Sequence, residues 1–260
     1  MFLALYIIAH ALEKYAFKGV FHITPTYALA VIFGLVLGPW KGALLGFISD
    51  VFVNILFRGI GTWMLEYAIV LVVIPFLTGF LMRLFSKDQS STWFFGIAFL
   101  LVVTGIFIGV VIANYNKLPT SEGATSLKKK IPLNIVAGIS AFGFSSIWIT
   151  TFVLLVIYFK TYDYKRKYAV SLFFNILITV FVILVIVRWL WGPYAYITYR
   201  NRYRNANWKV SEWYVRFMIP IVFKGLLEIP IYTIIIFHIY PVLTIVRNKV
   251  LYESRKIATY

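Results

Sequence analysis

The residues best suited to binding a ligand in this 260-residue chain lie in an aromatic and arginine-rich stretch, residues 192–204. Its sequence, GPYAYITYRNRYR, interleaves tyrosine rings with guanidinium groups. Such a mixture can stack on a planar heterocycle while it pairs with an anion. It is equally typical of an interfacial aromatic belt whose basic residues touch lipid headgroups. The sequence leaves both interpretations open, and we expect residues 192–212 to form a long outer loop.

A second polar group follows a glycine-rich segment, residues 38–50. Gly59 and Gly61 permit tight turns there, at the outer end of a predicted helix. A polar cluster at a helix mouth favours a binding site over ordinary loop polarity. The group consists of Arg58, Thr62, Trp63 and Glu66.

Acidic residues inside apolar sequence are the third candidate group, because a proton-coupled carrier would use them as its relay. Glu228 lies four residues after Lys224, a spacing that predicts a local ion pair on one helix. Glu13 and Lys14 lie near the end of the first apolar segment, where we expect them to reach the interface by snorkelling. We expect Asp50 to orient a neighbouring side chain and not to contact a ligand.

Catalytic and metal-binding patterns are missing from the sequence. It has no cysteine, and its three histidines are scattered, so no zinc motif can be written. The sequence shows no paired acids and no serine with a basic partner at a spacing typical of a catalytic site. It also shows no phosphate-binding glycine-rich loop. The sequence therefore predicts a protein that is not an enzyme and that holds no metal or cofactor.

The composition indicates a membrane protein. Hydrophobic residues make up 62% of the chain and charged residues 13%, and the mean hydropathy is +0.87. A soluble fold could not cover its core with so little polar surface. The net charge of +16 does not point to nucleic acid, because the basic residues lie mainly in short loops between apolar spans, where membrane topology accounts for them.

Eight apolar segments predict an all-α integral membrane protein that forms a single transmembrane domain over residues 1–260. Gly38 and Pro39 break the run 27–57 into two short helices folded back on each other. Gly42 and Gly46 share one face and permit close helix packing. The segments are 2–17, 26–38, 41–57, 65–85, 93–115, 134–159, 168–191 and 213–246.

Basic residues between the spans set the expected orientation. With eight helices, the basic groups at 83–87, 158–168 and 247–256 fall on the side of both termini. The positive-inside rule makes that side cytoplasmic. The opposite side is also basic, and the positive-inside rule does not explain the basic residues there. A bias towards Ile, Phe, Tyr and Lys indicates an AT-rich bacterial genome, so we expect a multi-pass protein of a bacterial cell membrane.

The glycine-rich segment and its flanks resemble the substrate-binding S component of energy-coupling factor (ECF) vitamin transporters, with folate-type members most similar. The family pattern has a short apolar helix ending in Gly-Pro, then Gly-Ala-x-x-Gly-x-x-Ser-Asp. The segment 188–192, with Arg216 and Pro220, is similar to the end of folate-type members. The residues that match the pattern are Gly38, Pro39, Gly42, Ala43, Gly46, Ser49 and Asp50.

This resemblance implies a bundle of six core helices, to which residues 93–160 add an apparent inserted helix pair with a Lys-rich outer loop. It also implies an ABC transporter complex in which this chain captures a vitamin, while a membrane scaffold subunit and two ATPase subunits drive its import. The first helix would dock the scaffold subunit. Its expected contact residues are Ala4, Ile8, Ala9 and Ala11. The signature residues Gly38, Pro39, Gly42, Gly46 and Asp50 would be structural, as would Lys224 and Glu228.

The resemblance further implies a vitamin site built from outer loops and the last helix. A basic, aromatic mouth suits folate, whereas riboflavin would need the rings but not the arginines. Another vitamin taken up by the same mechanism, or an independent proton-coupled carrier, remains an alternative. The implied site residues are His22, Thr24, Thr26, Arg58, Thr62, Trp63, Tyr194, Tyr196, Arg200 and Arg216.

Overall fold

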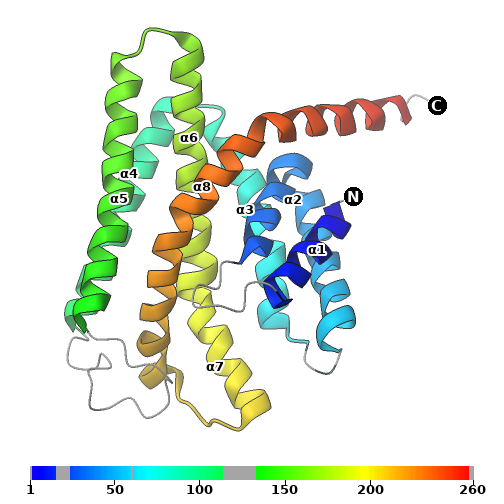
Figure 1. The fold of residues 1–260 in the computed structure, drawn as a ribbon, viewed down its shortest axis with the longest axis vertical. Helices are drawn as coiled ribbons and strands as arrows, with labels where there is room; N and C mark the ends of the chain where they lie inside the picture. Colours follow the sequence, from blue (N-terminus) through cyan, green and yellow to red (C-terminus); the bar gives the residue numbers. More distant parts are fainter. Residues whose placement is uncertain (1, 16–23, 60, 62, 114–132, 258–260) are drawn as a thin grey trace. The chain divides into compact units, whose positions relative to one another are not determined.

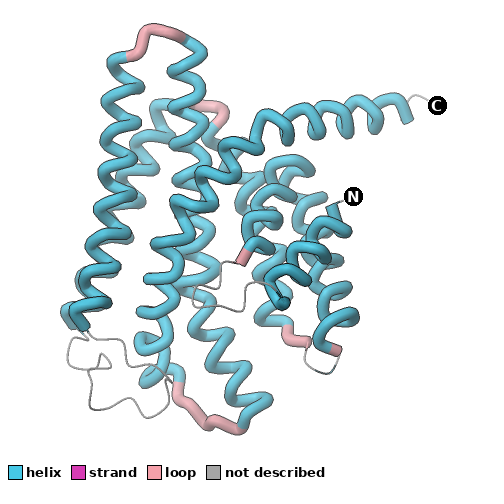
Figure 2. Tube along the Cα trace, viewed as in Figure 1, coloured by secondary structure: helices cyan, strands magenta, loops and turns pink. Residues whose placement is uncertain are grey.

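A computed structural model describes residues 2–15, 24–59, 61, 63–113 and 133–257 of the chain. These residues form helices joined by short loops, and no strand occurs among them (Figure 2), so the predicted all-α class is confirmed. The α-helices are α1 (Phe2–Tyr15), α2 (Pro25–Val53), α3 (Leu65–Phe85), α4 (Gln89–Ala113), α5 (Leu133–Lys160), α6 (Tyr164–Ile183), α7 (Trp191–Arg204) and α8 (Val210–Ile257) (Figure 1). Two π-helical segments are η1 (Asn54–Arg58) and η4 (Leu184–Leu190).

Six helical segments in the described chain are long and apolar enough to cross a membrane. Helix α1, with 14 residues, is about 21 Å long and falls short of a hydrocarbon core of about 30 Å. The predicted segments 26–38 and 41–57 both lie in one of the six. The six are Pro25–Phe57, Leu65–Phe85, Gln89–Ala113, Ser140–Lys160, Tyr164–Arg204 and Val210–Ile245.

Helix α2 is a hairpin of two short helices. Gly38 breaks it with φ 79° and ψ −178°, a conformation that glycine adopts without the strain a side chain would add. On the second half, a Cβ placed at Gly42 would lie 3.0 Å from the backbone oxygen of Phe33 on the first half. A straight helix would hold these residues about 13 Å apart. The predicted fold-back at Gly38 and Pro39 is therefore confirmed.

Helix α3 packs closely against both halves of this hairpin. A Cβ at Gly34 would overlap the backbone oxygen of Pro75, and one at Gly46 would overlap that of Leu71. From the other side, a Cβ at Gly79 of α3 would overlap the backbone nitrogen of Pro39. Small residues permit such backbone contact between helices in lipid, where the hydrophobic effect gives little drive to associate. The expected role of Gly46 in close helix packing is confirmed.

The chain divides into two compact units, and nothing in the sequence marks this division. Unit 1 comprises Met1–Lys87 and Ile231–Tyr260, and unit 2 comprises Asp88–Pro230. In unit 1, α1 and α3 pack against α2. In unit 2, α4 and α5 both pack against α6. The helices predicted over 93–115 and 134–159 correspond to α4 and α5, while the loop predicted between them lies outside the described residues.

The long outer loop expected over residues 192–212 is wrong. Helix α6 continues through η4 into α7, so residues 164–204 form one helical segment. Pro193 lies where the π-helical segment η4 passes into α7. Ala195 and Ile197 are 1% and 0% exposed, so burial of apolar side chains holds a polar, aromatic sequence in a helix.

Asp88 begins unit 2 as a cap for α4. Its Oδ1 accepts the backbone N–H of Ser90 at 3.0 Å, and its Oδ2 accepts the hydroxyl of Ser91. These bonds, led by the Ser91 hydroxyl, hold the pKa of Asp88 below its usual value.

A lowered pKa in the folded state means that Asp88 stabilises the fold above its unfolded-state pKa, and that this contribution is lost as the pH falls through the folded-state pKa. We expect the thermal midpoint of Asp88→Ala to fall less than that of the wild type between pH 6 and pH 3. Parallel thermal denaturation series in detergent would measure this. Identical pH profiles for the two proteins would show that Asp88 does not act as a cap.

Candidate functional site

The α7–α8 turn in unit 2 gathers two arginines and two tryptophans into one stack. The guanidinium of Arg200 lies 5.0 Å from the ring centre of Trp208, and that of Arg216 lies 5.0 Å from Trp213. The two indoles stack on each other with centroids 4.8 Å apart and planes 17° apart. We call these four residues the Arg–Trp cluster. Two cations thus lie over the rings of a stacked pair of indoles.

Local backbone chemistry fixes the turn that carries Trp208. Asn205 caps α7 in the left-handed conformation with φ 47°, and Asn207 has φ 51°. Asparagine tolerates this region better than most residues. The side chain of Asn201 donates to the Trp208 carbonyl at 2.9 Å and accepts the Trp208 N–H at 2.8 Å. This two-point contact positions Trp208 before any ligand arrives.

Predicted site residues of unit 2 divide between the cluster and its surroundings. Tyr196, one helical turn before Arg200, lies 4.9 Å from the ring of Phe217, which in turn lies 5.1 Å from Trp208. Tyr194 is 40% exposed and packs on Trp191. The structure thus brings the predicted Tyr196, Arg200 and Arg216 into one aromatic group and leaves Tyr194 beside it.

Sequence reasoning missed Asn201, Trp208 and Trp213 because it treated this region as a loop. Once residues 191–204 are helical, the i,i+4 spacing places Tyr196 and Arg200 on one face. The tight turn that follows then returns the chain to that face. Two tryptophans five residues apart, just after the arginines, were the signal that could have revealed them.

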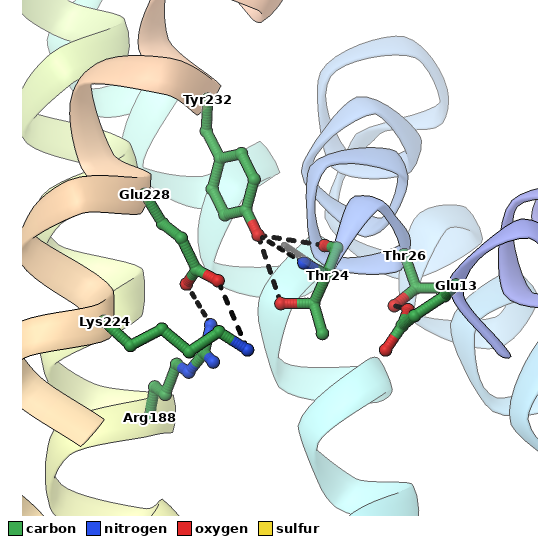
Figure 3. A network of polar contacts seen from close by, with 7 residues as sticks. All are labelled: Glu13, Thr24, Thr26, Arg188, Lys224, Glu228 and Tyr232. Atoms are coloured by element: carbon green, nitrogen blue, oxygen red, sulfur yellow. Dashed lines mark hydrogen bonds and ion pairs between the residues drawn. The ribbon is translucent and has the colours of Figure 1, made fainter. Parts of the chain in front are cut away.

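The predicted site residues of unit 1 bond within the unit. Thr26 Oγ1 donates to Glu13 Oε2 at 2.8 Å (Figure 3). The Tyr232 hydroxyl, 2% exposed, donates to the Thr24 carbonyl at 3.0 Å and lies 3.1 Å from its Oγ1. Trp63 Nε1 donates to Asp50 Oδ2 at 2.9 Å. Asp50, 7% exposed, thus holds a neighbouring indole in place.

Several predicted residues cannot be placed, and others differ in exposure. His22 and Thr62 lie outside the described residues, as does the side chain of Arg58. In the first helix, Ala4 and Ile8 are exposed, Ala11 is half-buried, and Ala9 is 9% exposed against its own unit. Ala9 therefore does not present itself to a partner in this structure.

Glu13 and Lys14 of α1 bind opposite ends of the α2 hairpin. Glu13 meets Thr26 in the first turn of α2, while Lys14 Nζ donates to the Phe57 carbonyl of η1 at 2.9 Å. A helix N-terminus favours an acid and a C-terminus favours a base. Glu13 and Lys14, adjacent in sequence, can contact both ends of the hairpin because its two ends lie close to each other. This internal arrangement replaces the snorkelling that we expected for the pair.

Exchanging the two charges, as in Glu13→Lys with Lys14→Glu, should reverse both favourable contacts. We expect the swap to lower stability by about 1–3 kcal/mol, because two hydrogen bonds are lost and each helix end meets the wrong charge. Thermal unfolding in detergent would measure the loss. The neutral double variant Glu13→Gln with Lys14→Met is the control. If the swap is no less stable than this control, the helix-end interpretation fails.

A charge cluster lies inside the helices of unit 2. Arg188 of η4 donates to Glu228 of α8, and Lys224 Nζ lies 3.7 Å from the other carboxylate oxygen (Figure 3). Glu228 is 2% exposed, the Arg188 side chain 12% and the Lys224 side chain 32%. The predicted local ion pair of Lys224 and Glu228 is confirmed. The sequence did not reveal Arg188 as its third member.

These features define the class of the protein. Six apolar helical spans, several of them with charged or polar residues bonded inside the fold, make it a multi-pass helical membrane protein. Within the described residues, no group of three or more His, Cys, Asp or Glu side chains could hold a metal ion. Comparison with family models, with curated proteins and with solved structures finds no match to this chain.

Proposed function

We propose that this protein is the membrane-embedded capture subunit of an ECF-type vitamin importer and that its ligand is a planar anion of the folate type. The Arg–Trp cluster is the observation that carries this proposal. A flat heterocycle can pack against the aromatic group around Trp208 and Trp213, while Arg200 and Arg216 pair with its carboxylates. The resemblance of segment 38–50 to the S components supports the same reading.

The cluster also has the rigidity that tight binding requires. Asn201 fixes Trp208 through two hydrogen bonds, and left-handed Asn205 fixes the end of α7. A site ordered in advance loses less conformational entropy when its ligand binds. Folate, with a pterin ring and two carboxylates, uses both the aromatic and the cationic parts. Riboflavin would use the rings alone.

Direct binding to the purified full chain tests this function. We expect folate to bind more tightly than riboflavin, and the double variant Arg200→Gln with Arg216→Gln to weaken folate binding by at least about a hundredfold, since each charge-assisted contact is worth about 1.5–3 kcal/mol. The matched control, Arg202→Gln with Arg204→Gln, removes the same charge from exposed positions of the same helix end. Equal losses in both double variants would overturn the proposed site.

Reconstitution separates the proposed importer from an independent carrier. We expect liposomes that contain this chain alone to bind folate but not to accumulate it, because import needs the scaffold and ATPase subunits. Accumulation driven by a proton gradient without those subunits would contradict the proposal.

A further inference from the structure

The charge cluster of unit 2 lies deep within two membrane-spanning segments. Arg188 belongs to the span Tyr164–Arg204, and Lys224 and Glu228 belong to Val210–Ile245. Arg188 precedes Arg200 by twelve residues and Glu228 follows Arg216 by twelve, so about 18 Å of helix separates this level from the Arg–Trp cluster. Ionisable residues at such depth are costly and generally mark functional positions.

Two cations lie against one carboxylate at this level. Arg188 and Lys224 carry two positive charges, and Glu228 carries one negative charge. The other acids of unit 2 that the structure describes, Asp88, Asp163 and Glu212, lie at helix ends. The helix interiors of this unit thus supply a single carboxylate, in contact with both cations.

Trp189 adds a third donor that the fold leaves without an acceptor. The residue is 4% exposed, and its Nε1 has no hydrogen-bond partner among the described residues. A Cβ built on Gly225 would overlap this nitrogen, so the indole packs directly against α8, next to Lys224 in sequence. Glycine at 225 leaves the indole the space that a side chain would fill. A buried donor without an acceptor is costly and calls for an explanation.

Aromatic rings of α5 and α6 pack against the indole of Trp189. The Trp189 ring lies 5.7 Å from Phe181 and 6.2 Å from Phe144, edge-to-face in both cases. The surroundings therefore combine two cations and an indole N–H with apolar, aromatic walls. A carboxylate attached to an aromatic or apolar body matches both properties.

We infer that Arg188, Trp189 and Lys224 form a second anion site inside unit 2, for a carboxylate with an apolar body, in which Glu228 is the resident carboxylate. An incoming carboxylate takes over the contacts of Glu228 with the two cations and also accepts the indole N–H. This site is separate from the Arg–Trp cluster and does not depend on the proposed vitamin.

Indole NMR of the full chain in detergent micelles tests the site directly. Labelling tryptophan with ¹⁵N gives signals for the eight indoles of the sequence, and Trp189→Phe identifies the Trp189 signal while it keeps the ring packing. Benzoate is the probe, and benzamide, its neutral counterpart, is the control. We expect the Trp189 signal to move in a saturable manner with benzoate and to stay in place with benzamide.

Two variants probe the charges. Lys224→Gln should weaken benzoate binding about tenfold through the loss of one cation, a change of about 1.4 kcal/mol. Glu228→Gln should tighten it at least about tenfold, because the resident carboxylate no longer competes. A Trp189 signal unmoved by benzoate, an equal response to benzamide, or unchanged affinity in Glu228→Gln would each overturn the inference.

The same spectra keep this inference distinct from the proposed function. Trp208→Phe and Trp213→Phe identify the two indole signals of the Arg–Trp cluster, which report folate. Benzoate acting on Trp189 while folate leaves Trp208 and Trp213 unmoved would support the inner site and refute the vitamin proposal. The reverse pattern would do the opposite.

Discussion

Gly46→Ala is expected to give a poorly folded protein, with a loss of at least about 1–3 kcal/mol, because the added Cβ would overlap the backbone oxygen of Leu71. Backbone atoms cannot move aside as the end of a flexible side chain can. The hairpin α2 and helix α3 would have to separate, and the packing around Pro75 would be lost. The thermal midpoint in detergent and the monodisperse yield in size-exclusion chromatography measure the effect.

Gly105→Ala is the matched control for this prediction. Gly105 also lies inside an apolar helix, α4, but a Cβ there would meet nothing within 4 Å. Because alanine favours the helix by up to about 1 kcal/mol over glycine, this variant should be as stable as the wild type or slightly more so. Equal damage from both substitutions would mean that helix packing at Gly46 is not the cause.

Arg188→Met is expected to cost about 3 kcal/mol. The substitution removes the guanidinium that binds Glu228 and leaves a carboxylate that is only 2% exposed. Breaking a buried pair on one side generally costs about 3–5 kcal/mol, and the contact with Lys224 at 3.7 Å keeps the expected value at the lower end. Thermal denaturation in detergent measures the loss.

The double variant Arg188→Met with Glu228→Met checks the cause of that loss. Apolar residues of similar size often replace a buried ion pair with little change in stability. We therefore expect the double variant to recover most of what Arg188→Met loses. A double variant as unstable as the single one would show that packing of the Arg188 stem, and not the orphaned charge, is responsible.

Interactions between residues close in sequence allowed much of the fold to be predicted. Gly38 and Pro39 together break a helix by their own backbone chemistry, so the hairpin could be expected from two residues. The pair Lys224 and Glu228 follows from i,i+4 spacing. Residues 192–204 misled us because their polar composition resembles a loop, while burial of Ala195 and Ile197 decides the structure.

Contacts between distant residues limited the prediction of the site. Tyr232 reaches Thr24 across 208 residues of sequence, and Arg188 reaches Glu228 across 40. The sequence predicted that Thr24 contacts a ligand, whereas in the structure it bonds to Tyr232, a residue that only the fold brings near. Arg200 was found because charge and aromatic content marked its segment, and Arg216 through the family resemblance, whereas Trp208 needed the return of the chain after α7.

The α2 hairpin also changes how membrane crossings are counted. Because Glu13 and Lys14 bind its two ends from adjacent positions, Thr26 and Phe57 lie at one level. We therefore expect residues 25–57 to leave the bilayer on the side from which they enter, and so to contribute an even number of crossings. If each of the five other candidate spans crosses once, the total from Pro25 to Ile245 is odd. We then expect the beginning of α2 and the end of the last span to face opposite compartments, whereas six single crossings would place them in the same one.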